Sequence, residues 1–249
     1  MVGRLSGNLH DLFLGSTNIT TIPMRKIYLI SLIALSSAVN AQTNSALTFN
    51  GTGTFVDIGM PFTAGTAYTK EAWVYLTNAA GARNIVSSSD VPFWVDGGVL
   101  KAGDRDNYGL VSDAGMPVNR WTHVAVTFGG GVLRLYRDGI LRSTSSIPVV
   151  PVAPQTTYIG SHQGTQAFWQ GAIDEVRLWN IPLTQTQLRV NMLKGPANNA
   201  PNLISYYKFN EGAGSVLTNS GTNGLGSNGA INAGTWSVSP VSFTANAVS

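Results

Sequence analysis

The carboxylates of this 249-residue chain are few, and their spacing gives little support to a catalytic pair. Hydrolysis of a glycosidic bond needs two facing carboxyl groups about 5 Å or roughly 6.5–9.5 Å apart. Asp104 and Asp106 have the i, i+2 spacing that puts two side chains on one face of a strand. They flank Arg105 in a loop-like segment, however, and we interpret them as a solvated turn. Asp174 and Glu175 are adjacent, so a regular strand directs them to opposite faces.

The sequence also lacks the residues for catalysis by a nucleophile with a base or by a metal ion. The chain has no cysteine, and its histidines after residue 41 are His123 and His162. No serine lies in a Gly-x-Ser-x-Gly elbow, and the sequence contains neither an EF-hand loop nor a zinc-binding pattern. We interpret His123, which lies in a strand-like run, as a packing or hydrogen-bonding residue. The sequence therefore predicts no enzyme and no catalytic residue.

The composition is typical of a β-rich protein without a nucleic-acid partner. Charged residues make up 11% of the chain, hydrophobic residues 43%, and there are 28 glycines, which favours short strands joined by turns. The formal net charge is +3. Three of the 15 basic residues and one of the 12 acidic residues precede Gln42, so residues 42–249 have a net charge of +1. Because no basic stripe remains, binding to nucleic acid is not expected.

Residues 24–41 have the layout of a secretory signal peptide. Met24, Arg25 and Lys26 precede an apolar stretch at 27–35 that is too short to span a bilayer, and a small-residue cleavage pattern ends at Ala41. A buried N-terminal helix is the alternative. Residues 1–23 are interpreted as a disordered upstream extension, and no later run predicts a transmembrane segment. The mature chain is therefore expected to be secreted, either extracellular or at the cell surface.

Alternating hydrophobicity predicts strand after strand from Ala46 onward. Strands are expected at 46–49, 54–58, 68–76, 121–128, 132–137, 171–179 and 203–209. Asp138-Gly139 lies between two such runs and predicts a two-residue hairpin, because both residues adopt positive φ at little cost. This pattern favours a sandwich or a barrel.

One short helix is expected near 185–193. Thr184 and Gln187 form a capping box, and Gly195 with Pro196 ends the helix. The Gly- and Asn-rich stretch at 211–234 is either a flexible linker or a set of ordered loops and short strands, and its spaced apolar residues favour the second. The domain is expected to span 42–240, followed by a tail at 241–249.

Five blocks between Ala46 and Asn180 resemble, in order, the strand motifs of the laminin-G-like, concanavalin A-like jelly-roll family. They are ALTFNG with FVDI at 46–58, EAWV at 71–74, WTHVAVTF at 121–128, LRLYRDG at 133–139 and GAIDEVRLWN at 171–180. The segment YYKFNEG at 206–212 resembles one that adjoins such domains. The departures are Asn50, Thr122 and Arg137, where the family more commonly has Asp, His and Val.

This resemblance implies an all-β fold, a two-sheet antiparallel β-sandwich of jelly-roll topology. Members of the family are adhesion or carbohydrate-binding modules, which implies a non-catalytic module whose partner is a glycan or a surface protein. The alternatives are a glycoside hydrolase of the same fold and a structural spacer domain in a larger surface adhesin. The module is expected to be a monomer or part of a larger protein, and the fold alone does not decide its function.

Aromatic side chains beside polar ones indicate where a sugar could bind on such a sandwich. Two segments, 93–96 and 104–108, supply that mixture, and the candidate ligand-binding residues are Trp94, Asp96, Arg105, Asp106 and Tyr108. Trp94 is the preferred contact. The other tryptophans in or beside the strand motifs are expected in the core: Trp73, Trp121, Trp169 and Trp179.

The resemblance also implies a structural calcium ion near the edge where the first and last strands meet. Its candidate ligands are Asn50, Gly51 and Asp174. The alternative is that Asp174 accepts hydrogen bonds from backbone amides of the opposite turn and holds no ion. Asn50, where the family has Asp, lowers the negative charge and argues for weak binding or none. No other cofactor is expected.

Overall fold

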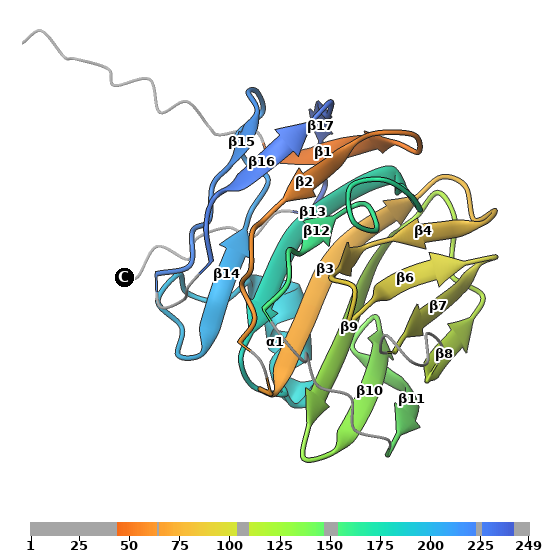
Figure 1. Cartoon of the computed structure of the whole chain (residues 1–249), viewed down its shortest axis with the longest axis vertical. Coiled ribbons are helices and arrows are strands. Elements are labelled where there is room, and N and C mark those ends of the chain that lie inside the picture. Colours follow the sequence, from red (N-terminus) through yellow and green to blue (C-terminus); the bar gives the residue numbers. More distant parts are fainter. Residues whose placement is uncertain (1–43, 64, 104–109, 147–153, 223–225, 242–249) are drawn as a thin grey trace, which may run out of the picture. The chain divides into compact units, whose positions relative to one another are not determined.

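The computed structural model describes residues 44–63, 65–103, 110–146, 154–222 and 226–241. The predicted leader, the upstream extension and all of the predicted tail except Val241 lie outside these ranges. Strands and turns dominate the described residues (Figure 1), and none of their helices is long and apolar enough to cross a membrane.

A large antiparallel sheet forms the first layer. Eight strands of the described ranges build it in the order β11-β10-β9-β3-β13-β1-β17, and β14 pairs with the part of β13 that β1 leaves open. Their bounds are β1 (Ser45–Asn50), β3 (Tyr68–Leu76), β9 (Trp121–Gly129), β10 (Val132–Arg137), β11 (Ile140–Ser145), β13 (Gln170–Trp179), β14 (Leu203–Tyr207) and β17 (Thr235–Val238).

Two smaller sheets form the second layer. The described strands of the second sheet run in the order β15-β16-β2-β12-β5, and those of the third sheet in the order β4-β6-β7-β8. The second sheet consists of β2 (Phe55–Asp57), β5 (Val86–Ser87), β12 (Tyr158–Ile159), β15 (Val216–Leu217) and β16 (Gly229–Asn232). The third sheet consists of β4 (Ala82–Asn84), β6 (Phe93–Asp96), β7 (Val99–Ala102) and β8 (Val111–Ala114).

The hydrophobic core lies between these layers. Val74 and Ile173 of the large sheet, Val56 of the second sheet and Phe93 of the third sheet belong to one cluster of fully or almost fully buried side chains. The predicted two-layer antiparallel sandwich is therefore confirmed. The interpretation of 211–234 as ordered chain is confirmed in its described part, because β15 and β16 pair with each other and β16 pairs with β2.

Helix α1 (Gln185–Lys194) covers part of the outer face of the large sheet. Its capping box at Thr184 and its end at Gly195 are as predicted. Leu188 packs in a second cluster with Trp179 of β13 and Tyr206 of β14. The predicted hairpin between β10 and β11 is also present, with φ of 50° at Asp138 and 67° at Gly139.

The outer face of the large sheet is covered at one end and open at the other. The strand registers place Thr48, Ala172, Tyr75 and Trp121 in one row across β1, β13, β3 and β9. The prediction that Trp73 and Trp121 lie in the core is wrong, since both are half-buried. Alternation along β3 and β9 turns these rings away from the core. The core prediction holds for Trp169 and Trp179.

A β-bulge interrupts β13. The register with β3 passes from Asp174 opposite Trp73 to Arg177 opposite Glu71, so β13 has one extra residue there. Glu175 has a φ of 54°, and its carboxylate accepts a hydrogen bond from Arg177 Nη2 at 2.6 Å. The bulge overturns the expectation that Asp174 and Glu175 point to opposite faces, because that expectation assumed a regular strand.

Candidate functional site

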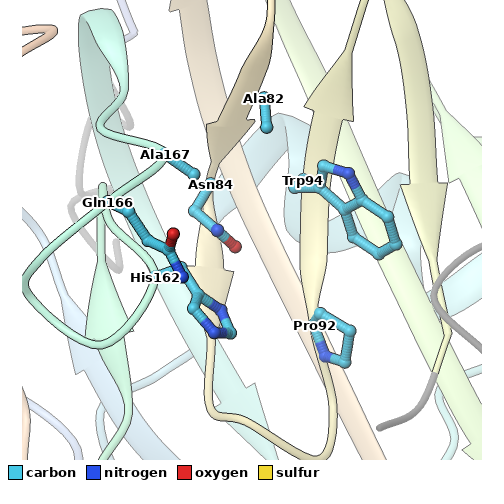
Figure 2. Close-up of a pocket in the computed structure, with 7 residues that line it drawn as sticks. All are labelled: Ala82, Asn84, Pro92, Trp94, His162, Gln166 and Ala167. Carbon is cyan, nitrogen blue, oxygen red and sulfur yellow. The ribbon is translucent and has the colours of Figure 1, made fainter. Parts of the chain in front are cut away.

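A pocket of about 340 Å³ opens on the outer face of the third sheet (Figure 2). In the picture the rings of His162 and Trp94 stand on its two sides, with Asn84 between them. The lining consists of Ala82, Asn84, Pro92, Trp94, His162, Gln166 and Ala167. An indole, an imidazole and two carboxamides thus surround one cavity, which is the mixture of apolar surface and hydrogen-bonding groups found in small-ligand sites.

Trp94 reaches the pocket because of its place in β6. Phe93 and Val95 point into the core, so the alternation of the strand turns Trp94 outward. Asn84 of β4 is its register partner on one side and Lys101 of β7 on the other. Trp94 is only 8% exposed, so it offers an edge of the indole to a ligand and not a whole ring face.

His162 and Gln166 come from the turn that follows β12. The His162 backbone amide donates to the Gln166 carbonyl at 2.8 Å, which closes the turn. The Asn84 amide donates to the Ala167 carbonyl at 2.8 Å, which fastens the turn to β4. Partial burial lowers the pKa of His162, so its imidazole is neutral near pH 7 and presents one donor and one acceptor.

Lys70 holds the segment that leads into β6. This lysine points into the core, and its Nζ donates to the carbonyls of Val86, at 3.1 Å, and Val91. The ammonium group also lies 5.4 Å from the ring centroid of Phe62. Burial lowers the pKa of Lys70 to about 7. Because Val86 and Val91 lie at the two ends of one loop, a single side chain fixes the connection from β5 to β6.

Of the two predicted ligand-binding residues that the structure describes, one lines the pocket. Trp94 lines it, whereas Asp96 forms an ion pair with Lys101 at 2.9 Å and is not part of the lining. Arg105, Asp106 and Tyr108 lie outside the described residues. Asn84, His162 and Gln166 were missed. Asn84 reaches Trp94 through the pairing of β4 with β6, and the turn with His162 and Gln166 reaches β4 through the Asn84–Ala167 backbone hydrogen bond, neither of which a short sequence pattern records.

The three predicted calcium ligands are not brought together. The Asn50 Oδ1 accepts hydrogen bonds from the amides of Thr52 at 2.9 Å and Gly53 at 3.0 Å, so it caps its own turn. Asn50 pairs with Gln170 in the β1–β13 register, four residues along the strand from Asp174. Gly51 follows in the same turn as Asn50.

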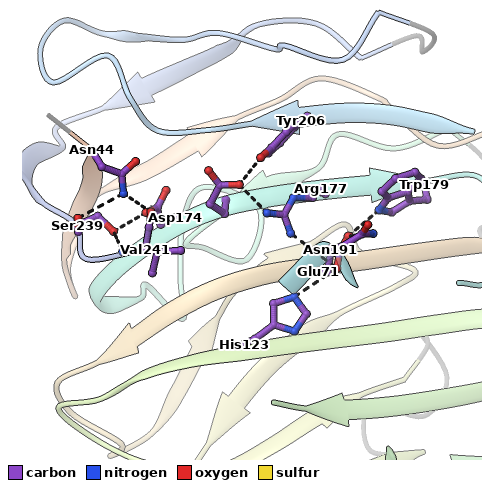
Figure 3. Close-up of polar contacts among 11 residues, drawn as sticks. Asn44, Glu71, His123, Asp174, Arg177, Trp179, Asn191, Tyr206, Ser239 and Val241 are labelled. Atoms are coloured by element: carbon purple, nitrogen blue, oxygen red, sulfur yellow. Dashed lines mark hydrogen bonds and ion pairs between the residues drawn. The ribbon is translucent and has the colours of Figure 1, made fainter. Parts of the chain in front are cut away.

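Asp174 is also poorly suited to an ion. Its carboxylate accepts a hydrogen bond from Ser239 Oγ at 2.5 Å (Figure 3), and burial raises its pKa to about 8. Among the described residues there is no group of three or more His, Asp or Glu side chains arranged to hold a metal ion. These residues do not fit one shared calcium ion, and calcium binding by the protein stays a prediction.

A second set of charged groups lies buried between α1 and the large sheet (Figure 3). Glu71 accepts hydrogen bonds from Trp179 Nε1 at 2.9 Å and Asn191 Nδ2 at 3.0 Å, and its Oε2 lies 3.3 Å from His123 Nε2. Burial alone would raise the pKa of Glu71, but His123 and Arg177 outweigh it and hold the pKa below its usual value. Because these groups are closed to solvent, they anchor α1 and are unsuited to binding a substrate.

These features agree with the family to which the chain belongs, the concanavalin A-like lectin/glucanase superfamily, whose laminin-G type model matches residues 43–189. No curated protein sequence matches the chain.

Solved structures show the same fold. A candidate carbohydrate-binding protein from Bacteroides ovatus superposes with a TM-score of 0.64 at 21% identity, over 81% of this chain and 62% of its own length. Domain 4 of an extracellular arabinanase from Geobacillus stearothermophilus, in complex with arabinotriose, gives a TM-score of 0.50 at 20% identity. This match covers 58% of this chain and 75% of the arabinanase domain. A pentraxin from Limulus polyphemus gives a TM-score of 0.52 at 16% identity, and the match covers 76% of this chain and 96% of the pentraxin. The chain therefore spans less than two thirds of the Bacteroides protein.

Proposed function

We propose that this chain is an extracellular, non-catalytic module that binds a glycan in the Trp94 pocket. The observation that carries the proposal is the lining itself, which combines the Trp94 indole with the side chains of His162, Asn84 and Gln166. A sugar ring offers C–H groups to the exposed edge of the indole and hydroxyl groups to the amides and the imidazole. The lining residues that the structure describes carry no formal charge near pH 7, which suits a neutral sugar.

Two of the structural neighbours support a carbohydrate ligand. One is described as a candidate carbohydrate-binding protein, and the other is an arabinanase domain in complex with arabinotriose. Their identity to this chain is 21% and 20%, so they support the class of ligand and not its identity. The secretory layout of residues 24–41 is consistent with a glycan ligand outside the cell.

Binding is favoured over hydrolysis by the composition of the pocket. None of its described lining residues is Asp or Glu, whereas glycoside hydrolysis uses two carboxyl groups. Asp174 and Glu175, the adjacent acidic residues of β13, are at most 2% exposed and lie on the large sheet. We therefore expect no release of reducing sugar when the protein is incubated with a panel of plant and microbial polysaccharides.

A glycan array tests the proposal, with arabinotriose included as one probe. The purified protein, Trp94→Ala and a control, Val216→Ala, are applied with calcium and again with chelator. Val216 is 52% exposed on β15, outside the pocket, so its substitution should leave binding unchanged. The proposal predicts saturable binding that Trp94→Ala reduces at least about tenfold, the effect of losing about 1.4 kcal/mol of contact. Equal binding by all three proteins would refute the pocket as the site.

A further inference from the structure

A second cavity lies on the opposite side of the sandwich from the Trp94 pocket. This outer-face groove, of about 260 Å³, is on the outer face of the large sheet beyond the end that α1 covers. Its lining includes Thr48, Tyr75, Trp121, Ala172, Ser237 and Val238. The hydrophobic core separates it from the third sheet, and the two cavities share none of the lining residues that the structure describes.

The groove exists because its floor is made of small residues. Ala172 and Gly171 occupy β13 between the taller side chains of β3 and β9 on one side and of β1 and β17 on the other. Gly171 has a φ of 135°, and a Cβ there would lie 1.9 Å from the carbonyl oxygen of Tyr75. Only glycine fits this position, which allows β13 to lie close to β3 beside Ala172.

The walls combine aromatic rings with hydroxyl groups. The centroids of the Tyr75 and Trp121 rings lie 5.7 Å apart at an interplanar angle of 53°, and both side chains are partly exposed to solvent. The Thr48 hydroxyl donates to the Ser237 hydroxyl at 3.0 Å, and the two face the rings across the floor. Val238, which is 81% exposed, forms part of the lining as well.

This chemistry matches a neutral sugar better than a charged ligand. None of the described lining residues carries a charge, so an anionic or cationic group would find no partner in the groove. Paired aromatic rings supply a surface for stacking against the C–H face of a pyranose or furanose, and the hydroxyl pair supplies both a donor and an acceptor. The volume is below the roughly 300–1,000 Å³ of sites for drug-sized ligands, which suits one or two sugar residues.

We propose that the outer-face groove is a second binding site for a neutral glycan. With the Trp94 pocket on the other layer, the module then holds two glycan segments at once and links separate chains. The inference goes beyond the proposed function, because it assigns a different site and does not depend on the Trp94 pocket being occupied.

Calorimetric titration with neutral trisaccharides tests this inference. Arabinotriose, xylotriose and cellotriose are titrated into the purified protein, Trp94→Ala, Trp121→Ala and the double variant. At least one trisaccharide should still bind Trp94→Ala, and adding Trp121→Ala should weaken that binding about tenfold or more. Identical isotherms for Trp94→Ala and the double variant, or no binding of any trisaccharide to the wild-type protein, would overturn the second site.

A substitution at the exposed rim of the groove tests the site independently of whether Trp121→Ala folds. Val238→Arg places a long charged side chain at the groove from an exposed position, so it should block the groove and leave the core intact. Val216→Arg is the matched control at another exposed valine. If only Trp94→Ala lowers affinity, the outer-face groove is refuted; if only Trp121→Ala and Val238→Arg do, the Trp94 pocket is refuted and the groove stands.

Discussion

At the scale of the residue, Lys70 has an environment that is unusual for a lysine. Its amine is fully buried, and its pKa falls from 10.5 to about 7. Between pH 7 and pH 10 the unfolded chain therefore binds more protons at this group than the folded chain does. Stability rises with pH wherever the unfolded state binds more protons, so Lys70 should make the folded state more stable as the pH rises through this window.

The comparison with Lys70→Met tests this expectation. Urea unfolding at pH 7, 8 and 9 should give a free energy of unfolding for the wild-type protein that rises relative to that of Lys70→Met. Met removes the titration while filling much of the same space. Parallel pH profiles for the two proteins would contradict a lowered pKa at Lys70.

Glu71 leads to a second prediction at the same scale. Glu71→Gln removes the negative charge that faces Arg177 and His123 in a closed environment, and breaking a buried pair costs about 3–5 kcal/mol. Asp96→Asn is the control, since its pair with Lys101 is partly exposed and such pairs contribute about 0–1 kcal/mol. Chemical denaturation measures both, and a similar loss in the two variants would show that burial does not strengthen the Glu71 cluster.

At the scale of the element, the sharpest constraint is the close approach of β13 to β3. Gly171→Ala would place a Cβ 1.9 Å from the Tyr75 carbonyl oxygen and would hold a side chain at a φ of 135°. Gly130→Ala separates the two effects, because Gly130 also has a positive φ, of 58°, but a Cβ there meets no atom within 4 Å. The control should lose about 1 kcal/mol, whereas Gly171→Ala should lose clearly more. Equal losses in thermal unfolding would mean that β13 moves away to admit the methyl group.

The elements themselves were largely predictable from sequence, because alternation and turn chemistry are local signals. The Asp138-Gly139 hairpin and the Thr184 capping box are read from neighbouring residues, and both are present. The bulge at Glu175 was not predictable, since its position coincides with the exchange of β1 for β14 beside β13. Register between distant strands decides that exchange, and no short sequence pattern records it.

The candidate site was predictable only in part, for the same reason. Trp94 stood out as an aromatic residue in a polar segment, but His162 joins it from about 70 positions away through the turn after β12. Trp121 was expected in the core because it lies in a strand motif. A motif does not say which face of a sheet a neighbouring element covers, and α1 leaves this part of the face open.

At the scale of the whole molecule, calcium binding would affect the stability of the fold. An ion that binds only the folded protein raises its melting temperature. Because Asn50 and Asp174 are separated along β1 and β13, any melting-temperature shift between calcium and chelator should be the same in the wild-type protein and in Asp174→Asn. Differential scanning calorimetry measures it, and a shift that disappears in Asp174→Asn would restore Asp174 as a calcium ligand.

The most direct test of the account asks whether a bound glycan lies against Trp94. The indole N–H signal of Trp94, assigned with Trp94→Phe, is followed by ¹⁵N NMR while a glycan selected from the array is titrated. We predict a progressive, saturable shift of that signal, whereas the signal of the buried Trp169 stays fixed. A glycan that binds without moving the Trp94 signal, or a protein that binds no glycan, would contradict the assignment of this pocket.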